Sequence, residues 1–300
     1  MTAIALKSTL WSLSIKPFKR KGGTNLLLNA SDLALGLRGI GWNWSQVHLA
    51  PETRPTSSKT TFVLWTLASL CLHIPVFDAL HYAVQSFGPT TFGTINGGSI
   101  FDDTLSPLLR YSRSTFISFL SGLVIYCAIR ITYDVATVFG IVVLRQHPTQ
   151  WPPIFNSPWR ATSLSQFWSK RWHQLFRDFF VGVGGVPMTY MFGRIGGVLG
   201  TFFISGLLHD VGLWGMGKGS DAVCMIGFFI MMGFGVILEG FWRKVTGHRV
   251  DGWIGWIWMC TWLLGWLNLL VNAWAAKGLI GSLFIPDAQR LPVKIFGPLS

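Results

Sequence analysis

Five long apolar stretches constrain the fold of this chain more than any other feature of its sequence. They cover residues 61–86, 115–144, 190–214, 222–242 and 253–274, with an extension of the last to Phe284 as an alternative end. A helix needs about 20 mainly apolar residues to cross the hydrocarbon core of a bilayer, where its backbone groups must bond to one another. The sequence therefore predicts an all-α integral membrane protein, a multi-helix bundle with about five spans.

The composition supports the same fold class. Only 12% of the 300 residues are charged and 50% are hydrophobic, whereas soluble domains carry about 25% charged residues. So few charges cannot cover a water-soluble protein of this size, which excludes a soluble enzyme, a disordered regulator and a coiled coil. The net charge of +12 does not point to nucleic acid, because membrane proteins concentrate Lys and Arg in cytoplasmic loops.

The distribution of basic residues predicts an orientation in the membrane. The region up to Lys59 and residues 145–189 and 243–249 together carry sixteen Lys and Arg, and the alternate loops with the C-terminal region carry six. The positive-inside rule then places the N-terminus in the cytosol and the C-terminus on the opposite side. The first 23 residues lack the charge order and apolar core of a signal peptide, so insertion is expected to rely on the internal helices.

The run of residues 163–180 is too charged to span and has the periodicity of an amphipathic helix. Its apolar residues recur at helical spacing on one face and its polar residues occupy another; the first set is Trp168, Trp172, Leu175, Phe176 and Phe179, the second Lys170, His173, Gln174 and Arg177. This pattern predicts a helix in the membrane interface. Two interpretations stay open: a surface anchor, or a binding face for an anionic, phosphate-bearing substrate.

His209 is the strongest candidate for chemistry inside the membrane. It lies near the end of the third apolar stretch, where an ionisable side chain is costly and usually faces a polar cavity. Ser205 and Gly206 are expected to leave open space on its face of the helix, and the glycines that precede them to serve as packing points for neighbouring helices; these are Gly193, Gly196, Gly197 and Gly200. An interior histidine that is merely hydrogen-bonded remains the alternative.

Other ionisable residues in the apolar stretches carry weaker signals. His73 and His81 are eight residues apart, and a packing or lining role is favoured over a metal site. Arg130 and Asp134 are four residues apart and are expected to neutralise each other. Glu239 is expected to reach water near the cytoplasmic end of the fourth span. No metal is expected.

Three motifs resemble one family. Residues 167–176, FWSKRWHQLF, resemble the FW-x-x-RWHQ-x-F signature of the wax synthase branch of the membrane-bound O-acyltransferases. Residues 203–211, FISGLLHDV, resemble that family's second motif, and residues 38–44, RGIGWNW, resemble an upstream motif of fungal members of the secondary-metabolism type. The resemblance implies a multi-helix fold like that of this family, with a membrane acyltransferase domain over residues 61–284. A cytosolic or interfacial region over residues 1–60 and a C-terminal loop over residues 285–300 would flank it.

The resemblance also implies roles for matching residues. His209 matches the family's essential intramembrane histidine, and His173 matches a position held by histidine in wax synthases and by asparagine in many other members. We expect both to be catalytic, with His209 as general base. His173 would bond the thioester carbonyl or the departing thiol, or orient His209. The residues expected to bind substrate or coenzyme A are Lys170, Arg171, Trp172, Gln174 and Arg177.

The expected activity is acyl-CoA-dependent O-acyl transfer to a lipophilic alcohol in a multi-pass protein of the endoplasmic reticulum. The resemblance to fungal members suggests acetyl-CoA as co-substrate and a terpenoid or meroterpenoid hydroxyl as acceptor, with no bound cofactor. A long-chain-alcohol O-fatty-acyltransferase is the first alternative. A small membrane transporter and a membrane terpene cyclase are alternatives of other classes. The expected partners are the two substrates and membrane lipids, without nucleic acid, and the sequence does not fix the oligomeric state.

Overall fold

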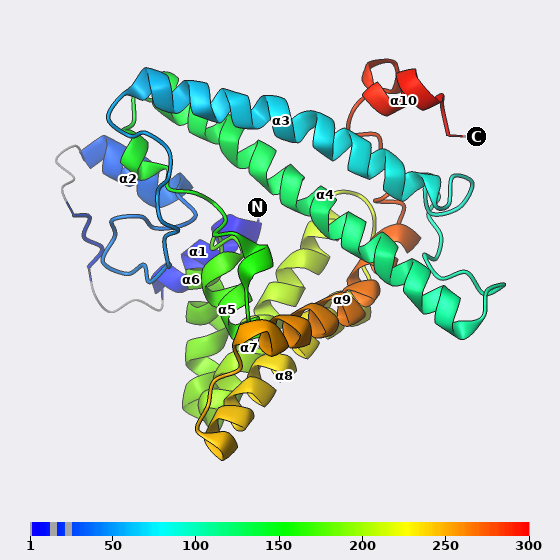
Figure 1. Cartoon of the computed structure of the whole chain (residues 1–300). Helices are drawn as coiled ribbons and strands as arrows, with labels where there is room; N and C mark the ends of the chain where they lie inside the picture. The colour runs from blue at the N-terminus through cyan, green and yellow to red at the C-terminus, as the bar shows by residue number, and fades with distance from the viewer. Residues whose placement is uncertain (1, 13–16, 22–25, 300) are drawn as a thin grey trace. The chain divides into compact units, whose positions relative to one another are not determined.

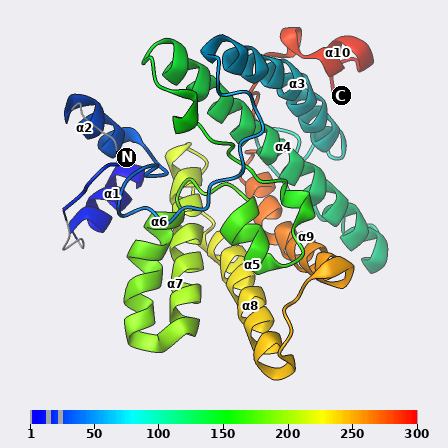
Figure 2. The same ribbon diagram turned by 60° about the vertical axis from the view of Figure 1, so that its left-hand side comes forward.

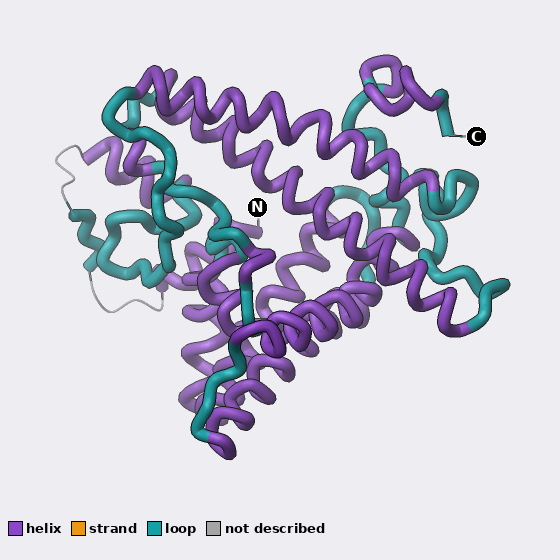
Figure 3. Tube along the Cα trace, in the orientation of Figure 1, coloured by secondary structure: helices purple, strands orange, loops and turns teal. Residues whose placement is uncertain are grey.

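The computed structural model describes residues 2–12, 17–21 and 26–299. The remaining residues, which include parts of the expected N-terminal region and the last residue of the expected tail, lie outside the described residues. The protein is 67% helical, and the described residues form no strand beyond an isolated bridge between Arg20 and Trp42 (Figure 3). The prediction of an all-α fold is therefore confirmed.

Five helices are long and apolar enough to span a membrane. The first two are α3, Lys59–Ser86, and α4, Pro107–Val142, which lie side by side (Figure 1). The helical segment Arg177–Gly215 contains the third, and α8, Ala222–Thr246, and α9, Gly252–Ala276, are the fourth and fifth. The main part of the third span is α7, Val186–Gly215. The shorter helices are α1 (Thr2–Ser12), α2 (Leu26–Leu35), α5 (Leu164–Gln166), α6 (Arg177–Phe180) and α10 (Leu291–Phe296).

The chain forms two compact units that interleave along the sequence. The first contains Met1–Pro51, Pro152–Gly212 and Met225–Trp262, and the second contains Glu52–Trp151, Leu213–Cys224 and Leu263–Ser300. Both histidines of the expected active site belong to the first unit. The sequence predicts three consecutive parts, residues 1–60, 61–284 and 285–300. That functional division differs from the two units and stays a prediction.

The second unit is organised around α3 and α4. Ser58 caps α3 by accepting a hydrogen bond from the Thr61 amide, and Pro107 occupies the first turn of α4, where a missing N–H costs nothing. Arg130 Nε lies 2.9 Å from Asp134 Oδ2, which confirms the expected neutralisation. The core between the helices is apolar and includes Phe77, Val84, Ile117, Val124, Cys127, Val271 and Ala275.

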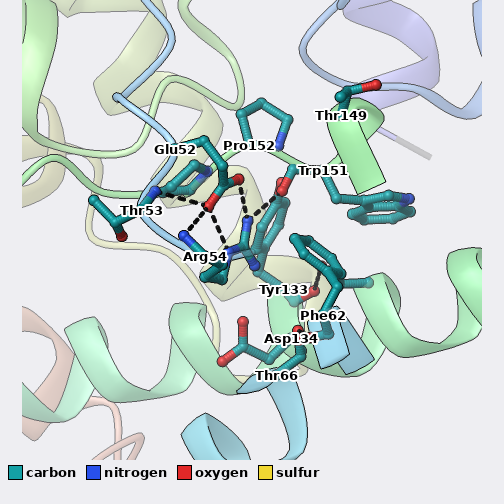
Figure 4. Close-up of polar contacts among 12 residues, drawn as sticks. Glu52, Thr53, Arg54, Phe62, Thr66, Tyr133, Asp134, Thr149, Trp151 and Pro152 are labelled. Atoms are coloured by element: carbon teal, nitrogen blue, oxygen red, sulfur yellow. Dashed lines mark hydrogen bonds and ion pairs between the residues drawn. The ribbon is translucent and has the colours of Figure 1, made fainter. Parts of the chain in front are cut away.

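The loop that enters α3 is fixed by one arginine. Arg54 pairs with Glu52 at 2.8 Å, donates to the Trp151 carbonyl, and lies 4.3 Å from the centre of the Phe62 ring (Figure 4). A guanidinium that satisfies a carboxylate and a carbonyl while covering an aromatic ring suits the boundary between polar loop and apolar helix. This cluster therefore holds the start of α3 against the segment that follows α4.

The C-terminal segment is more ordered than the expected loop. The extension of the fifth span to Phe284 is wrong, because α9 ends at Ala276 and Gly278 takes a positive φ of 66°. The residues beyond it form a short turn and α10, in which Pro292 occupies the first turn, a position that tolerates proline. Arg290 anchors this segment: it is 2% exposed and bonds Asp78 at 2.8 Å and Gln85 at 2.9 Å.

The two histidines of α3, for which a packing or lining role is expected, are each held by a backbone carbonyl. His81 Nε2 lies 2.7 Å from the Ile280 carbonyl, and His73 Nδ1 lies 2.8 Å from the Ser69 carbonyl of its own helix. Since a carbonyl only accepts, each histidine donates there. Each ring is thus hydrogen-bonded to a different backbone carbonyl, and the two histidines do not form a shared metal site.

Helix α7 differs from the expected third span. The backbone leaves helical geometry at Phe192 and Gly193, where Gly193 has a φ of 64°, and the helix reverses direction (Figure 2). The two arms, residues 177–191 and 194–215, lie side by side and meet through glycines: a Cβ on Gly184 would stand 2.2 Å from the Gly200 carbonyl oxygen. The expected span over residues 190–214 therefore crosses a turn, and its spanning helix begins at Arg194.

The first arm does not cross a membrane by itself. Fifteen residues give a helix about 22 Å long, which is shorter than a hydrocarbon core of about 30 Å.

The glycines of the third apolar stretch are expected to be packing points. This is confirmed for Gly197 and Gly200, which face Gly185 and Gly184 within the same hairpin.

Candidate active site

The segment that carries His173 enters the first unit alongside α8 and α9. The Trp159 carbonyl accepts from Trp256 Nε1 at 2.9 Å, and the Thr162 carbonyl lies against Gly255, so the segment begins near the start of α9. Leu164 then packs on Gly235, in the middle of α8. The chain therefore runs along α8, towards the end at which α8 begins.

Glu239 of α8 fixes this segment. Its carboxylate accepts hydrogen bonds from the Leu164 amide at 2.6 Å and the Ser165 amide at 2.9 Å. A third bond comes from Trp258 Nε1 at 3.1 Å. Glu239 is 7% exposed, so the expectation that it reaches water is wrong. The cost of burying this carboxylate in a membrane helix is offset because it accepts hydrogen bonds from the free amides at the start of α5.

The expected continuous helix over residues 163–180 is broken. After the single turn of α5, residues Phe167–Arg171 form a π-helical turn, and the backbone is extended at Trp172. Gln174 Nε2 then donates to the carbonyls of Trp168 and Trp172, at 2.9 and 3.0 Å. The apolar and polar faces expected from helical periodicity are therefore absent, because the helix does not continue past Arg171. The break turns the chain so that α6 and the first arm of the hairpin run back along the unit.

The aromatic residues of this segment pack inside the protein. Trp168 contacts the rings of Phe202, Phe228 and Phe229 at 6.0–6.4 Å between centroids. Trp172 stacks on Phe167 at 5.4 Å. The apolar residues expected on one face of an interfacial helix thus pack against other helices of the unit.

His209 is held in one tautomer. Its Nδ1 lies 2.7 Å from the Ser205 carbonyl oxygen, and its ring lies 4.4 Å from the centre of the Phe229 ring. Because a carbonyl can only accept, Nδ1 carries the hydrogen, and the neutral ring keeps its lone pair on Nε2. Gly206 does not open space as expected: a Cβ there would stand 2.7 Å from the Ile226 Cα, so Gly206 lets α8 approach closely.

His173 lies in the same region of the unit. Burial lowers its pKa to about 3, with further lowering by the neighbouring His209 and Arg38. His173 is therefore neutral at physiological pH. Its Nδ1 is buried and has no hydrogen-bond partner. Two further buried polar atoms of the motif, Trp168 Nε1 and Gln174 Oε1, share that property. Buried polar atoms are normally paired in folded proteins, which makes these three atoms candidates for contact with a polar group of a substrate.

The basic residues of the motif do not form one face. Lys170 is exposed. Arg171 is bonded within the protein, to the Gln166 side chain at 3.0 Å and the Asn156 carbonyl at 3.1 Å. Arg177 donates to the Gln46 carbonyl at 3.0 Å. The structure thus brings His173, Trp172 and Gln174 to the region of His209, while Arg171 and Arg177 are engaged in holding loops together.

Arg38 is a residue of the site that was not singled out from the sequence. It is 6% exposed, and its guanidinium donates to the Pro152 carbonyl from both terminal nitrogens at 3.2 Å. It fixes the segment that leads to Phe155, whose ring lies 6.2 Å from that of His173. The signal was present in the RGIGW motif, but the partner lies 114 residues away and no local pattern reveals it.

The fold and site define a multi-pass helical membrane protein with a pair of histidines in its interior. The profile of the membrane bound O-acyl transferase family matches residues 151–231, which carry His173 and His209. This finding confirms the resemblance of the motifs to that family, and the relatives described next support its wax synthase-like branch.

Curated relatives cover different shares of the chain. It is 28% identical over 176 residues to "Acetyltransferase spyB" of Aspergillus fumigatus, covering 49% of this chain and 29% of the relative. It is 27% identical over 298 residues to "O-Mevalon transferase yanI" of Aspergillus niger, covering 83% and 63%. It is 34% identical over 99 residues to "Probable long-chain-alcohol O-fatty-acyltransferase 1" of Arabidopsis thaliana, covering 30% and 29%. The chain thus spans less than two thirds of each of these relatives, and no solved structure matches it.

Proposed function

We propose that this protein is an acyl-CoA-dependent O-acyltransferase that esterifies a hydroxyl group of a lipophilic alcohol. The observation that carries the proposal is the pair of histidines: His209 with its lone pair on Nε2, and neutral His173 with a buried, unpartnered Nδ1. An alcohol is a poor nucleophile until a base removes its proton, and imidazole suits that task near neutral pH.

The reaction follows from these two rings. His209 Nε2 takes the hydroxyl proton while the alcohol oxygen attacks the thioester carbonyl carbon. The new C–O bond forms, the C–S bond breaks, and the imidazolium of His209 returns the proton to the departing thiolate of coenzyme A. We propose that His173 donates its ring N–H to the carbonyl oxygen, where negative charge develops. Its neutral state matters, because a second cation beside His209 would oppose protonation of that base.

The substrates are the finer part of the proposal. The names of several fungal relatives, acetyltransferases among them, support acetyl-CoA as donor and a terpenoid or meroterpenoid alcohol as acceptor. We propose the endoplasmic reticulum as the location, with the alcohol entering from the membrane. We place Lys170, Arg171, Trp172, Gln174 and Arg177 around the coenzyme, Lys170 by direct contact and the others by shaping the segment. The long-chain-alcohol acyltransferase and transporter alternatives are less well supported.

The test compares extracts of cells that express the wild-type protein or the His209→Ala variant. The proposal predicts a pair of lipophilic metabolites that differ by one acyl group, with the ester present only in wild-type cells. Purified wild-type protein should then release free coenzyme A from acetyl-CoA when that alcohol is added. An acyl-CoA that stays intact with every alcohol recovered from the extracts would reject the proposal.

A further inference from the structure

A cavity lies in the first unit, away from the two histidines. It has a volume of about 630 Å³ and opens between the second arm of α7 and the last turns of α8. Three of its lining residues are cations, Arg194, Arg243 and Lys244, and the rest are apolar or glycine, including Val198, Val236, Ile237 and Phe241. We call it the basic groove. Its volume is that of a small-molecule site.

The three cations have no carboxylate partner among the residues that the structure describes. Arg243 and Lys244 lie in the last turn of α8, where the helix dipole favours them. Arg194 lies at the start of the second arm, where the dipole opposes a cation. The three positive charges also repel one another, and an anion bound between them would reduce this repulsion.

The surroundings of the groove are apolar and exposed. Ile195, Phe241 and Val245 are each more than half exposed. Cations at the ends of membrane helices, beside exposed apolar surface, lie at the depth of lipid headgroups. A ligand that suits both features carries a phosphate for the cations and acyl chains for the apolar flank.

The groove is closed towards the histidines. Arg194 precedes His209 by 15 residues, about 22 Å along the helix. Between them α7 and α8 are in close contact, because a Cβ on Gly233 would stand 3.2 Å from both Leu199 and Phe202. The pantetheine arm of a coenzyme A whose phosphates lay in the groove could not pass between these helices to His209.

We propose that the basic groove binds the headgroup of an anionic phospholipid, which clamps the turn of the α7 hairpin to the end of α8. The lipid is a structural ligand of the helix pair and takes no part in acyl transfer. The phosphate is contacted by Arg194, Arg243 and Lys244, and the acyl chains lie along the exposed face of α8.

The test measures binding of dioleoyl-phosphatidylglycerol to the purified protein in a neutral detergent, with dioleoyl-phosphatidylcholine of the same chain length as comparison. Wild-type protein should bind the anionic lipid about tenfold more tightly or better. The variant with Arg194→Gln, Arg243→Gln and Lys244→Gln should bind both lipids equally. Gly240 lines the groove with open space above it, so Gly240→Leu should fill the groove and weaken binding without changing charge.

Arg249 provides the matched control. It is exposed in the loop that follows α8 and does not line the groove, so Arg249→Gln should keep the preference for the anionic lipid. Equal binding of the two lipids by wild-type protein, or an equal loss in the control variant, would overturn the proposal. Displacement of the lipid by inorganic phosphate or coenzyme A at equal concentration would also overturn it, because it would show a plain anion site or a coenzyme site.

Discussion

His209 donates from Nδ1 to the carbonyl oxygen of Ser205, one turn earlier in the same helix, at 2.7 Å. The bond fixes the tautomer by means of backbone alone, and the ring is supported by Phe229 from α8. The orientation of the proposed base is therefore determined by the second arm of α7 and its contact with α8, and the segment that carries His173 approaches this fixed ring.

Substitutions of His173 should separate its hydrogen bond from its volume. Alanine removes both, and asparagine keeps a donor close to the position of the ring N–H. We expect His173→Ala to lower kcat more strongly than His173→Asn, by about tenfold or more, as for loss of one donor to an oxyanion. Steady-state kinetics of both purified variants provides the measurement. Equal kcat values for the two variants would contradict a role as hydrogen-bond donor.

The stability of the protein at low pH should also depend on His173. Its pKa is about 3 in the folded protein and close to 6.5 in an unfolded chain. Between these values the unfolded chain binds a proton that the folded protein excludes, so the free energy of unfolding falls as the pH decreases below 6.5 and is unaffected above it.

This dependence is tested by thermal unfolding of wild-type protein and His173→Asn at pH 7.5 and pH 5.0. The wild type should lose stability relative to the variant by up to about 1.4 kcal/mol for each pH unit below 6.5. Parallel losses in the two proteins would show that other groups carry the pH dependence.

Glu239→Gln should loosen the segment that carries His173. The carboxylate accepts three hydrogen bonds, from Leu164, Ser165 and Trp258. The amide of glutamine offers one acceptor oxygen and places a donor near these N–H groups. We expect a loss of about 1–3 kcal/mol of stability for each donor left buried and unpaired, together with reduced kcat. Trp258→Phe removes a single donor and leaves both amide bonds in place, so a similar loss in that variant would argue against the role of the two amides.

Lys170 and Arg171 should respond differently although they are neighbours. Lys170 is exposed and free to contact a phosphate, so Lys170→Gln should raise the KM for acyl-CoA by roughly tenfold and leave the KM for the alcohol unchanged. Arg171 bonds Gln166 and the Asn156 carbonyl, so Arg171→Gln should lower thermal stability. An unchanged KM for acyl-CoA in Lys170→Gln would remove this residue from the coenzyme site.

Hydropathy alone predicted most of the fold, because membrane-spanning helices are selected by length and apolar content. It missed the reversal at Phe192 and Gly193, since both arms of the hairpin are apolar and only the backbone angles of these two residues distinguish the turn. The periodicity of residues 163–180 failed for a related reason. A π-helical turn and the bonds of Gln174 shift the register, and neither is visible as a change in hydrophobicity.

The candidate site was partly accessible from the sequence. His209 stood out because an ionisable residue in an apolar helix is costly, and His173 stood out through the motif that it shares with a known family. Glu239 and Arg38 could not be placed, because their partners lie 75 and 114 residues away. Contacts of this kind depend on tertiary packing, which local sequence does not encode.

The kcat of the His209→Ala variant tests the proposed role of His209 as general base most directly. It is measured on purified protein whose gel-filtration elution and thermal unfolding match those of the wild type. Alanine is smaller and apolar, so the membrane helix should tolerate it. Loss of a general base should lower kcat at least about 100-fold, with little change in the KM for either substrate. A turnover close to that of wild type would contradict the assignment of His209 as the base and with it the proposed mechanism.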